Sequence, residues 1–185
     1  MTDQLTIVQD PEKIRLFLQL IRQNKDKEAV DFLINNFTDL ELNSTVIVNN
    51  GIEMNFMDCA AIQGALEVMK VLHERGLSLD RPSVSIFGTT NWAVLNYLLE
   101  HNSFIANAQD KDGINPLQNL ITHYKYYPEN KSKYLESLKL MLLFQSDPHM
   151  KGFQGLSAIE QAELLGDSDL MAVLNGDENL RSTLH

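Results

Sequence analysis

Residues 107–121 read NAQDKDGINPLQNLI and contain the clearest local structural signals in the chain. Asp110 and Gly113 are residue types that favour tight turns. Pro116 stands where the first turn of a helix does not need a backbone N–H. Apolar residues at helical spacing follow it. The stretch therefore predicts a tight turn that leads directly into a helix over about 115–123.

A second helical pattern recurs along the chain. It is clearest in residues 64–79, GALEVMKVLHERGLSL, where apolar positions alternate with charged ones at helical spacing. Similar patterns occupy residues 25–40, 92–106, 135–148 and 155–174. Repetition of one unit along a chain is typical of repeat proteins, in which each unit buries its apolar face against its neighbours.

The turn, the Pro-Leu pair and the second helix together resemble the ankyrin repeat, whose turn ends in Gly and leads into Thr-Pro-Leu-His. This resemblance implies an all-α ankyrin-repeat solenoid of about five helix-turn-helix units with β-hairpin fingers. The whole chain, 1–185, is then a single domain with repeats at about 11–42, 43–80, 81–106, 107–148 and 149–176 and a C-terminal tail at 177–185.

The repeats are irregular, and the irregularities can be located. The positions that end successive repeats, Phe37, Gly76, Asn102 and Gln145, lie 39, 26 and 43 residues apart, on either side of the ankyrin period of about 33. Asn49-Asn50-Gly51 between β-rich runs predicts a lengthened hairpin finger over Val46–Phe56. The third repeat starts with hardly any finger. Residues 124–134 form an insertion between two helices.

Ten helices are expected, two in each repeat, and Gly76 and Gly176 are expected to end two of them. The expected helices are 11–23, 27–36, 55–63, 66–75, 82–87, 92–101, 115–123, 133–144, 157–165 and 168–174. The expected core comprises Ala60, Val68, Leu72, Val94, Leu98, Leu99, Leu117, Leu140, Met141, Ile159, Ala162 and Val173. The family's His is replaced by Gln118 and Glu160, which argues against the usual polar network between repeats.

Composition narrows the classes of function. A net charge of −10 and a pI near 4.8 argue against a nucleic-acid-binding protein, which would be basic. Apolar runs are far shorter than the roughly 20 residues of a membrane span, and no secretory signal is visible at the N-terminus. Cys59 is the only cysteine, so an intrachain disulfide is impossible. A cytoplasmic protein that does not contact membranes is therefore expected.

A search for catalytic chemistry finds little. Asp58-Cys59 invites interpretation as a nucleophile, but a small apolar residue is expected to pack at Cys59, beside Ala60. The five histidines show no i, i+4 pair that would hold a metal, and no phosphate-binding glycine motif occurs. We therefore expect no enzyme activity, no metal and no cofactor; an enzyme that uses Cys59 is the remaining alternative from that class.

Partner binding is expected on the concave face that the ankyrin resemblance implies, formed by turn tips and by first-helix positions. Several of these positions are apolar, and a contiguous exposed apolar strip marks an interaction site. The expected partner-binding residues are Ile62, Gln63, Asp110, Lys111, Asp112, Ile114, His123, Phe153, Gln154 and Leu156, with Gly88, Thr89, Thr122, Leu164 and Leu165 at equivalent positions. Alternatively, Leu164 and Leu165 pack under the C-terminal tail.

Tyr126 and Tyr127 complete the expected binding residues, because the insertion that contains them is basic and aromatic. The alternative is a solvated insertion whose tyrosines cover a helix end. The acidic Asp110 and Asp112 beside Ile114 would steer a basic partner.

The expected function is non-catalytic protein–protein interaction by a monomer. The irregular repeats and the Asn-rich composition resemble ankyrin proteins of intracellular bacteria, which implies an effector delivered into a host cell and acting on a host protein. The alternative within the binding class is an acidic immunity-type or inhibitor protein that covers a basic toxin or enzyme.

Overall fold

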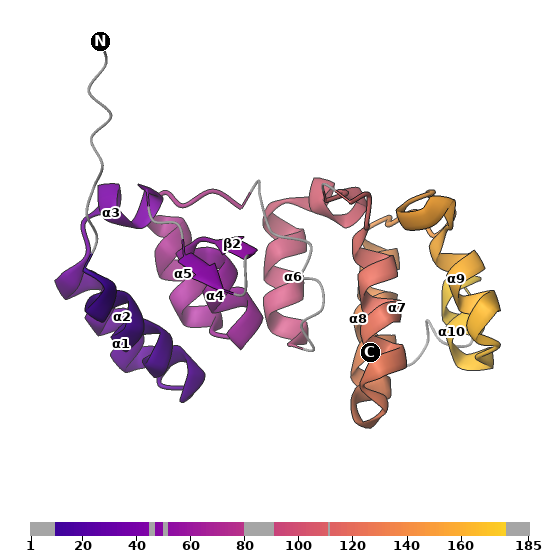
Figure 1. Cartoon of the computed structure of the whole chain (residues 1–185), viewed down its shortest axis with the longest axis horizontal. Coiled ribbons are helices and arrows are strands. Elements are labelled where there is room, and N and C mark those ends of the chain that lie inside the picture. Colours follow the sequence, from indigo (N-terminus) through magenta and orange to yellow (C-terminus); the bar gives the residue numbers. More distant parts are fainter. Residues whose placement is uncertain (1–9, 45–46, 50–51, 80–90, 111, 177–185) are drawn as a thin grey trace, which may run out of the picture. The chain divides into compact units, whose positions relative to one another are not determined.

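The computed structural model describes residues 10–44, 47–49, 52–79, 91–110 and 112–176. The chain divides into two compact units, Met1–Arg81 and Pro82–His185. Within each unit, most described residues belong to helices that pack beside one another (Figure 1). The all-α class expected from the sequence is therefore confirmed.

The first unit contains two helix pairs joined by a short helix and two strands. Its elements are α1 (Pro11–Arg22), α2 (Asp26–Asn36), α3 (Asp39–Ser44), β1 (Ile47–Asn49), β2 (Ile52–Met54), α4 (Phe56–Gln63) and α5 (Leu66–Glu74). The four long helices match the predicted ones to within one residue at each end, whereas α3 was not predicted. α1 packs on α4 and α2 packs on α5, so first helices and second helices form separate layers.

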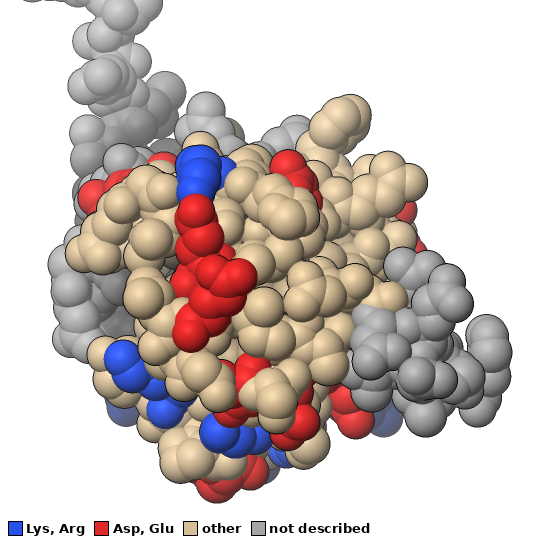
Figure 2. Space-filling model, turned by 90° about the vertical axis from the view of Figure 1, so that its right-hand side faces the viewer, with Lys and Arg blue, Asp and Glu red and all other residues tan. Residues whose placement is uncertain are grey.

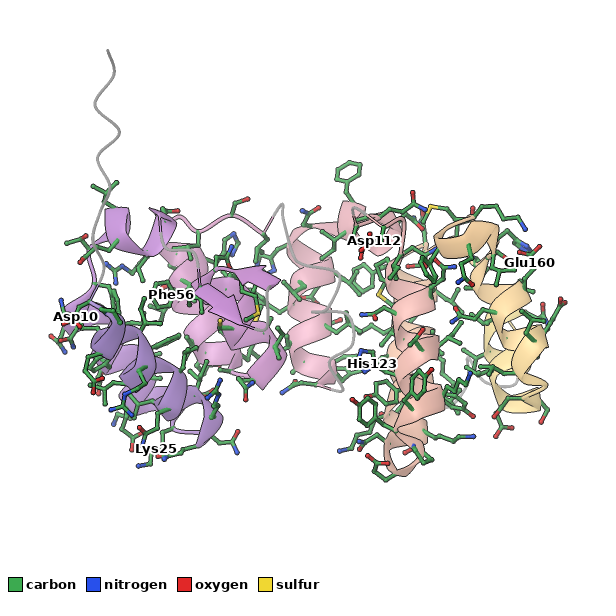
Figure 3. All side chains as sticks on the ribbon, in the orientation of Figure 1. Asp10, Lys25, Phe56, Asp112, His123 and Glu160 are labelled. Carbon is green, nitrogen blue, oxygen red and sulfur yellow. The ribbon has the colours of Figure 1, made fainter. Side chains whose placement is uncertain are left out.

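Local chemistry explains where these helices begin. Asp10 caps α1 by accepting a hydrogen bond of 2.9 Å from the N–H of Glu12. Asn55 and Asp58 form a reciprocal capping box at α4, with bonds of 2.8 and 3.0 Å. The ring of Phe56 meets two other core rings edge to face, those of Phe17 and Phe37, at centroid distances of 5.1 and 5.0 Å, inside the first unit (Figure 3).

The two strands form an antiparallel pair with Ile47 opposite Met54, Val48 opposite Glu53 and Asn49 opposite Ile52. Strand pairing is therefore present where the Asn-Gly turn predicted a hairpin, although Asn50 and Gly51 lie outside the described residues. The second strand ends earlier than expected. Asn55 caps α4, and the buried Phe56 is the first residue of α4 rather than part of the hairpin.

The described residues of the second unit form five α-helices and three short 3₁₀ turns. Its elements are α6 (Trp92–His101), η2 (Ser103–Asn107), α7 (Pro116–Tyr126), η3 (Pro128–Asn130), α8 (Lys131–Leu143), η4 (Phe153–Gly155), α9 (Ala158–Leu165) and α10 (Ser168–Leu174). α7 packs on α9, while α8 packs on both α6 and α10. The helix expected over 82–87 lies outside the described residues, as do Gly88 and Thr89.

The prediction of an inserted loop over residues 124–134 is wrong. α7 continues through Tyr124 to Tyr126, and α8 begins at Lys131. Only a short 3₁₀ turn at Pro128–Asn130 separates the two helices, because Pro128 cannot continue the hydrogen-bond ladder of α7. The extra residues therefore lengthen both helices instead of forming a loop.

The core predicted from the repeat pattern is confirmed. All twelve predicted core residues are buried, with exposed fractions of 9% or less. They come from both helix layers of each unit, as helices with one apolar face require. The predicted helix-ending glycines Gly76 and Gly176 adopt positive φ angles of 86° and 70°, which confirms the expected left-handed ends.

Candidate functional site: an apolar groove between α7 and α9

A groove of about 410 Å³ runs between α7 and α9 within the second unit. Three structural sources supply its walls: the turn before α7, the 3₁₀ turn η4 before α9, and the facing sides of the two helices. The lining residues are Ile114, Gln118, Thr122, Lys125, Tyr126, Phe153, Gln154, Leu156, Gln161, Leu164 and Leu165. Helical spacing explains the set, because residues three or four apart lie on one face of a helix.

The apolar side chains of the groove are accessible. Leu164 is 75% exposed, Tyr126 66% and Phe153 46%. Ile114 and Leu156 are half-buried. Apolar surface of this kind normally becomes buried in a contact, since it gains roughly 25 cal/mol for each Å² removed from water.

The turn before α7 is held by one carboxylate. Asp110 Oδ1 accepts hydrogen bonds from the N–H groups of Asp112 and Ile114, at 2.9 and 2.8 Å. The N–H of Asp110 also donates to the carbonyl of Ile114 over 3.1 Å, and Gly113 supplies a positive φ of 77°. These bonds fix Ile114 at the groove. The role of Asp110 in the structure is thus to shape the turn.

A capping box starts α7. Asn115 Oδ1 accepts from the N–H of Gln118 over 3.0 Å, and Gln118 Oε1 accepts from the N–H of Asn115 over 3.3 Å. Pro116 occupies the first helical turn, as predicted. Both Asn115 and Gln118 are buried, so their polar groups need these partners.

Gln118 also connects the two sides of the groove. Its Nε2 donates to the carbonyl of Leu156 over 2.9 Å, and its Oε1 accepts from the N–H of Phe153 over 3.3 Å. The replacement of an ankyrin-type His by Gln118 was expected to argue against polar links between the two turns, but Gln118 makes such links. The glutamine side chain can replace a histidine in linking the two turns, because its amide has both a donor and an acceptor.

Further hydrogen bonds join equivalent positions of the two successive turns. Ser146 Oγ donates to the carbonyl of Ala106 over 2.8 Å. Asn107 Oδ1 accepts from the N–H of Asp147 over 2.7 Å, and Gln109 Nε2 donates to the carbonyl of Lys151 over 2.8 Å. Each of these bonds spans 40 or 42 residues. Other bonds between the same parts of the chain span 35 or 38 residues.

The structure brings together five of the twelve predicted binding residues in this groove, along with three of the equivalent positions. The five are Ile114, Tyr126, Phe153, Gln154 and Leu156, and the three are Thr122, Leu164 and Leu165. Whether the tail packs on Leu164 and Leu165 lies outside the described residues, as does Lys111.

Ile62 and Gln63 do not join this groove. They lie on α4 in the first unit, at a smaller cavity of about 140 Å³ that Leu18 and Cys59 also line. Asp112 is exposed in the turn before α7 (Figure 3) and does not line the groove.

His123 and Tyr127 belong to an aromatic cluster on another face of α7. The imidazole stacks on the ring of Tyr127 at 5.6 Å between centroids and lies 5.9 Å from the ring of Tyr134 on α8. Burial lowers the pKa of His123 below its ordinary value of 6.5. Its surroundings make it a packing residue between helices.

The remaining tyrosines of the predicted aromatic segment are also structural. Tyr124 and Tyr134 are buried. The Tyr124 hydroxyl donates to Asp167 Oδ2 over 2.8 Å, and Lys131 Nζ lies 3.1 Å from the same oxygen. Burial pushes the pKa of Asp167 upward, but hydrogen bonds from Tyr124, Leu170 N–H and Lys131 lower it overall. Both tyrosines lie within helices, Tyr124 on α7 and Tyr134 on α8, rather than in the solvated insertion of the alternative interpretation.

Two residues of the groove, Gln118 and Gln161, were not predicted to bind a partner, and Lys125 was considered only as part of the basic, aromatic insertion. Gln118 and Gln161 could have been found, since Gln118 precedes Thr122 by four residues and Gln161 precedes Leu165 by four. Lys125 was expected in an inserted loop, and only the longer α7 turns it toward the groove.

Cys59 is buried, with an exposed fraction of 5%. Desolvation, reinforced by the charge of Asp58, raises the pKa of its thiol to about 12. The reactive form of cysteine is the thiolate, so this environment disfavours nucleophilic chemistry. Within the described ranges, no group of three His, Cys, Asp or Glu side chains is placed to hold a metal ion.

Acidic side chains lie on α9, one of the two helices that flank the groove. Figure 2 faces the α9 and α10 end and shows a band of acidic residues beside wide uncharged surface. α9 contributes Glu160, which pairs with Lys151, and the exposed Glu163.

None of the helices in the described part of the chain combines the length and apolar character needed to cross a membrane. Comparison with models of known protein families gives no match, and comparison with curated proteins gives none either.

Proposed function

We propose that this chain is a non-catalytic protein-interaction domain of the ankyrin-repeat type, which binds a partner protein in the groove between α7 and α9. One observation carries the proposal: apolar side chains from α7, from α9 and from the turns before them converge on one accessible groove. Hot spots of protein interfaces are large apolar or aromatic side chains of this kind.

The ankyrin assignment draws support from three features. First helices pack on first helices and second helices on second helices within each unit. Gly113 and Pro116 supply the expected turn and helix start. Hydrogen bonds join the segments before α7 and α9 at offsets of 35 to 42 residues. Together they favour stacked copies of one helix-turn-helix unit.

An enzyme using Cys59 is the less favoured alternative. Its thiol is buried and its pKa of about 12 leaves very little thiolate near neutral pH. The proposed site of action is the cytosol, either of the source cell or of a host cell into which an effector is delivered.

A second candidate is an inhibitor-type protein that covers a basic partner. The acidic band at the α9 and α10 end (Figure 2) and the net charge of −10 favour it. Such a partner would associate faster at low salt, since its attraction is screened by ions.

Cross-linking capture followed by mass spectrometry tests the proposal. The full chain and its Phe153→Ala variant are compared in a lysate of the source cell and in a host-cell lysate. We expect one partner to be captured by the parent chain and lost with Phe153→Ala. Phe104→Ala is the matched control, because Phe104 is 91% exposed and lies outside the groove. A partner retained by Phe153→Ala and released by high salt would favour the inhibitor function instead.

A further inference from the structure

We infer that the partner presents a short amphipathic helix to the groove, with apolar side chains one turn apart and a carboxylate at the end that meets Lys125. The inference rests on the proposed protein-binding function and specifies the chemistry of the partner. It follows from three properties of the groove: its charge, its polar floor and its length.

The charge of the groove comes from a single side chain. Lys125 is the one charged residue among the described residues that line it. Lys125 is exposed, its Nζ lies 5.5 Å from the ring centroid of Tyr126, and it forms no ion pair within the described ranges. A lone cation in the lining, on a chain of net charge −10, selects an anionic group of the partner at that end.

An acidic side chain lies just outside the opposite end of the groove. Asp112 is exposed in the turn that precedes Ile114, whereas Lys125 lies in the last turn of α7. A guest with its carboxylate near Asp112 would face repulsion. Lys125 in the lining and Asp112 outside its other end therefore favour one direction for a charged segment.

The side-chain donors on the groove floor already have partners, whereas Oε1 of Gln161 is buried and has none among the described residues. Gln118 Nε2 donates to the Leu156 carbonyl, Thr122 Oγ1 donates to the Gln118 carbonyl over 2.9 Å, and Gln161 Nε2 donates to Thr122 Oγ1 over 3.2 Å. These donors are not available for the backbone of an extended peptide, whose polar groups would be desolvated without partners. A helix satisfies its own backbone and buries only an apolar face.

The length of the groove matches such a helix. Gln118 and Lys125 are seven residues apart on α7, which corresponds to about 10 Å along the helix axis. Ile114 and Phe153 extend the apolar wall beyond that point. A guest of roughly two to three turns, with apolar residues at i, i+4 and i+7, presents one side chain per turn to this wall.

A random dodecapeptide display library selected on the full chain tests the inference. Enriched sequences are synthesised with a fluorophore, and their affinities are measured by fluorescence anisotropy. We expect enrichment of apolar residues three or four apart with Asp or Glu at one end. Phe153→Ala should lower the affinity for these peptides at least tenfold, whereas Phe104→Ala should leave the affinity unchanged.

Charge reversal then isolates Lys125. Lys125→Glu should lower the affinity for acidic peptides by about three- to fivefold, which is the effect expected from the loss of one exposed ion pair. Replacing the carboxylate of the peptide by lysine should restore its affinity for that variant. Lys133→Glu is the matched control, since Lys133 is exposed on α8 and outside the groove.

Other results of these experiments would contradict the inference, and one of them would also contradict the proposed function. Peptides that need Phe153 but show no acidic preference, or whose alanine scan shows alternate rather than helical spacing, overturn the inference and leave the proposed function standing. If no selected peptide responds to Phe153→Ala, both fall. Concentration-dependent dimers that Phe153→Ala abolishes would assign the groove to a second copy of the chain, which also overturns the inference.

Discussion

The side-chain amide of Gln118 donates a hydrogen bond of 2.9 Å to the carbonyl of Leu156, 38 residues further along the chain. The oxygen of the same amide accepts from the N–H groups of Asn115 and Phe153. One buried side chain thus closes the cap of α7 and holds the turn before α9. The apolar wall of the groove depends on this connection, because Phe153 and Leu156 are both positioned by it.

Gln118→Ala is expected to destabilise the second unit by about 1–3 kcal/mol. The substitution leaves the N–H groups of Asn115 and Phe153 without their acceptor, while the Leu156 carbonyl keeps only its bond from the N–H of Gly152. Unsatisfied buried groups cost about this much. Urea unfolding followed by circular dichroism measures the change. Gln154→Ala should change the free energy of unfolding by less than half a kcal/mol or so, since an exposed substitution rarely does more.

Gly152→Ala is expected to cost about 1–3 kcal/mol for a steric reason. A Cβ at this position would lie 2.7 Å from the carbonyl oxygen of Gly113 and closer still to Oε1 of Gln118. The backbone of one turn must therefore shift. Gly155→Ala is the comparison, because a Cβ there meets open space and costs only the strain of its positive φ of 71°.

The two effects should be coupled. When Gln118 is already alanine, the added methyl group at Gly152 loses its closest neighbour. The double variant is therefore expected to be less destabilised than the sum of the single variants. Simple additivity would show that the clash with the Gly113 carbonyl alone determines the cost.

Much of the fold was predictable because its signals are local. The starts of α4, α7 and α9 are marked by Asn55, Asn115 and Ser157, each followed three residues later by the side chain that completes its capping box. Apolar residues at helical spacing identified the core in both units.

The remaining features depend on contacts that are distant in sequence. α7 gains an extra turn that packs against later elements, since the Tyr124 hydroxyl bonds to Asp167, 43 residues away. No local pattern encodes that partner. The groove was only partly predictable for the same reason. Turn positions such as Phe153 could be predicted from the alignment of the expected repeats. Lys125 lines the groove only because α7 is longer than expected.

Cys59 is expected to react slowly with a thiol reagent in the native protein at neutral pH. The thiol is buried and its pKa is raised to about 12, so both access and thiolate are scarce. Stopped-flow alkylation with and without urea gives the comparison. Rapid alkylation without denaturant would contradict the structural role of this residue and revive the enzyme alternative.

Ile114→Ala is expected to weaken partner binding at least tenfold with little effect on stability. The side chain is half-buried at the groove, and truncating a hot-spot residue costs about 2 kcal/mol or more in binding. Binding is measured by titration calorimetry with a captured partner or a selected peptide. Ile34→Ala, the same truncation at a residue that is 57% exposed in the first unit, should leave affinity unchanged.

The last prediction concerns pH, through His123. Burial lowers the pKa of this imidazole below 6.5, so the folded state favours its neutral form. The unfolded chain then takes up a proton at higher pH than the folded chain does. The resulting stability is complete above pH 6.5 and is lost as the pH falls through the lower pKa of the folded state. Urea unfolding at a series of pH values from 7.5 to about 5 should show this decline, and His123→Gln should flatten it. The same substitution at the exposed His149 should leave the decline unchanged. An identical slope in His123→Gln and the parent chain would show that other groups cause the pH dependence.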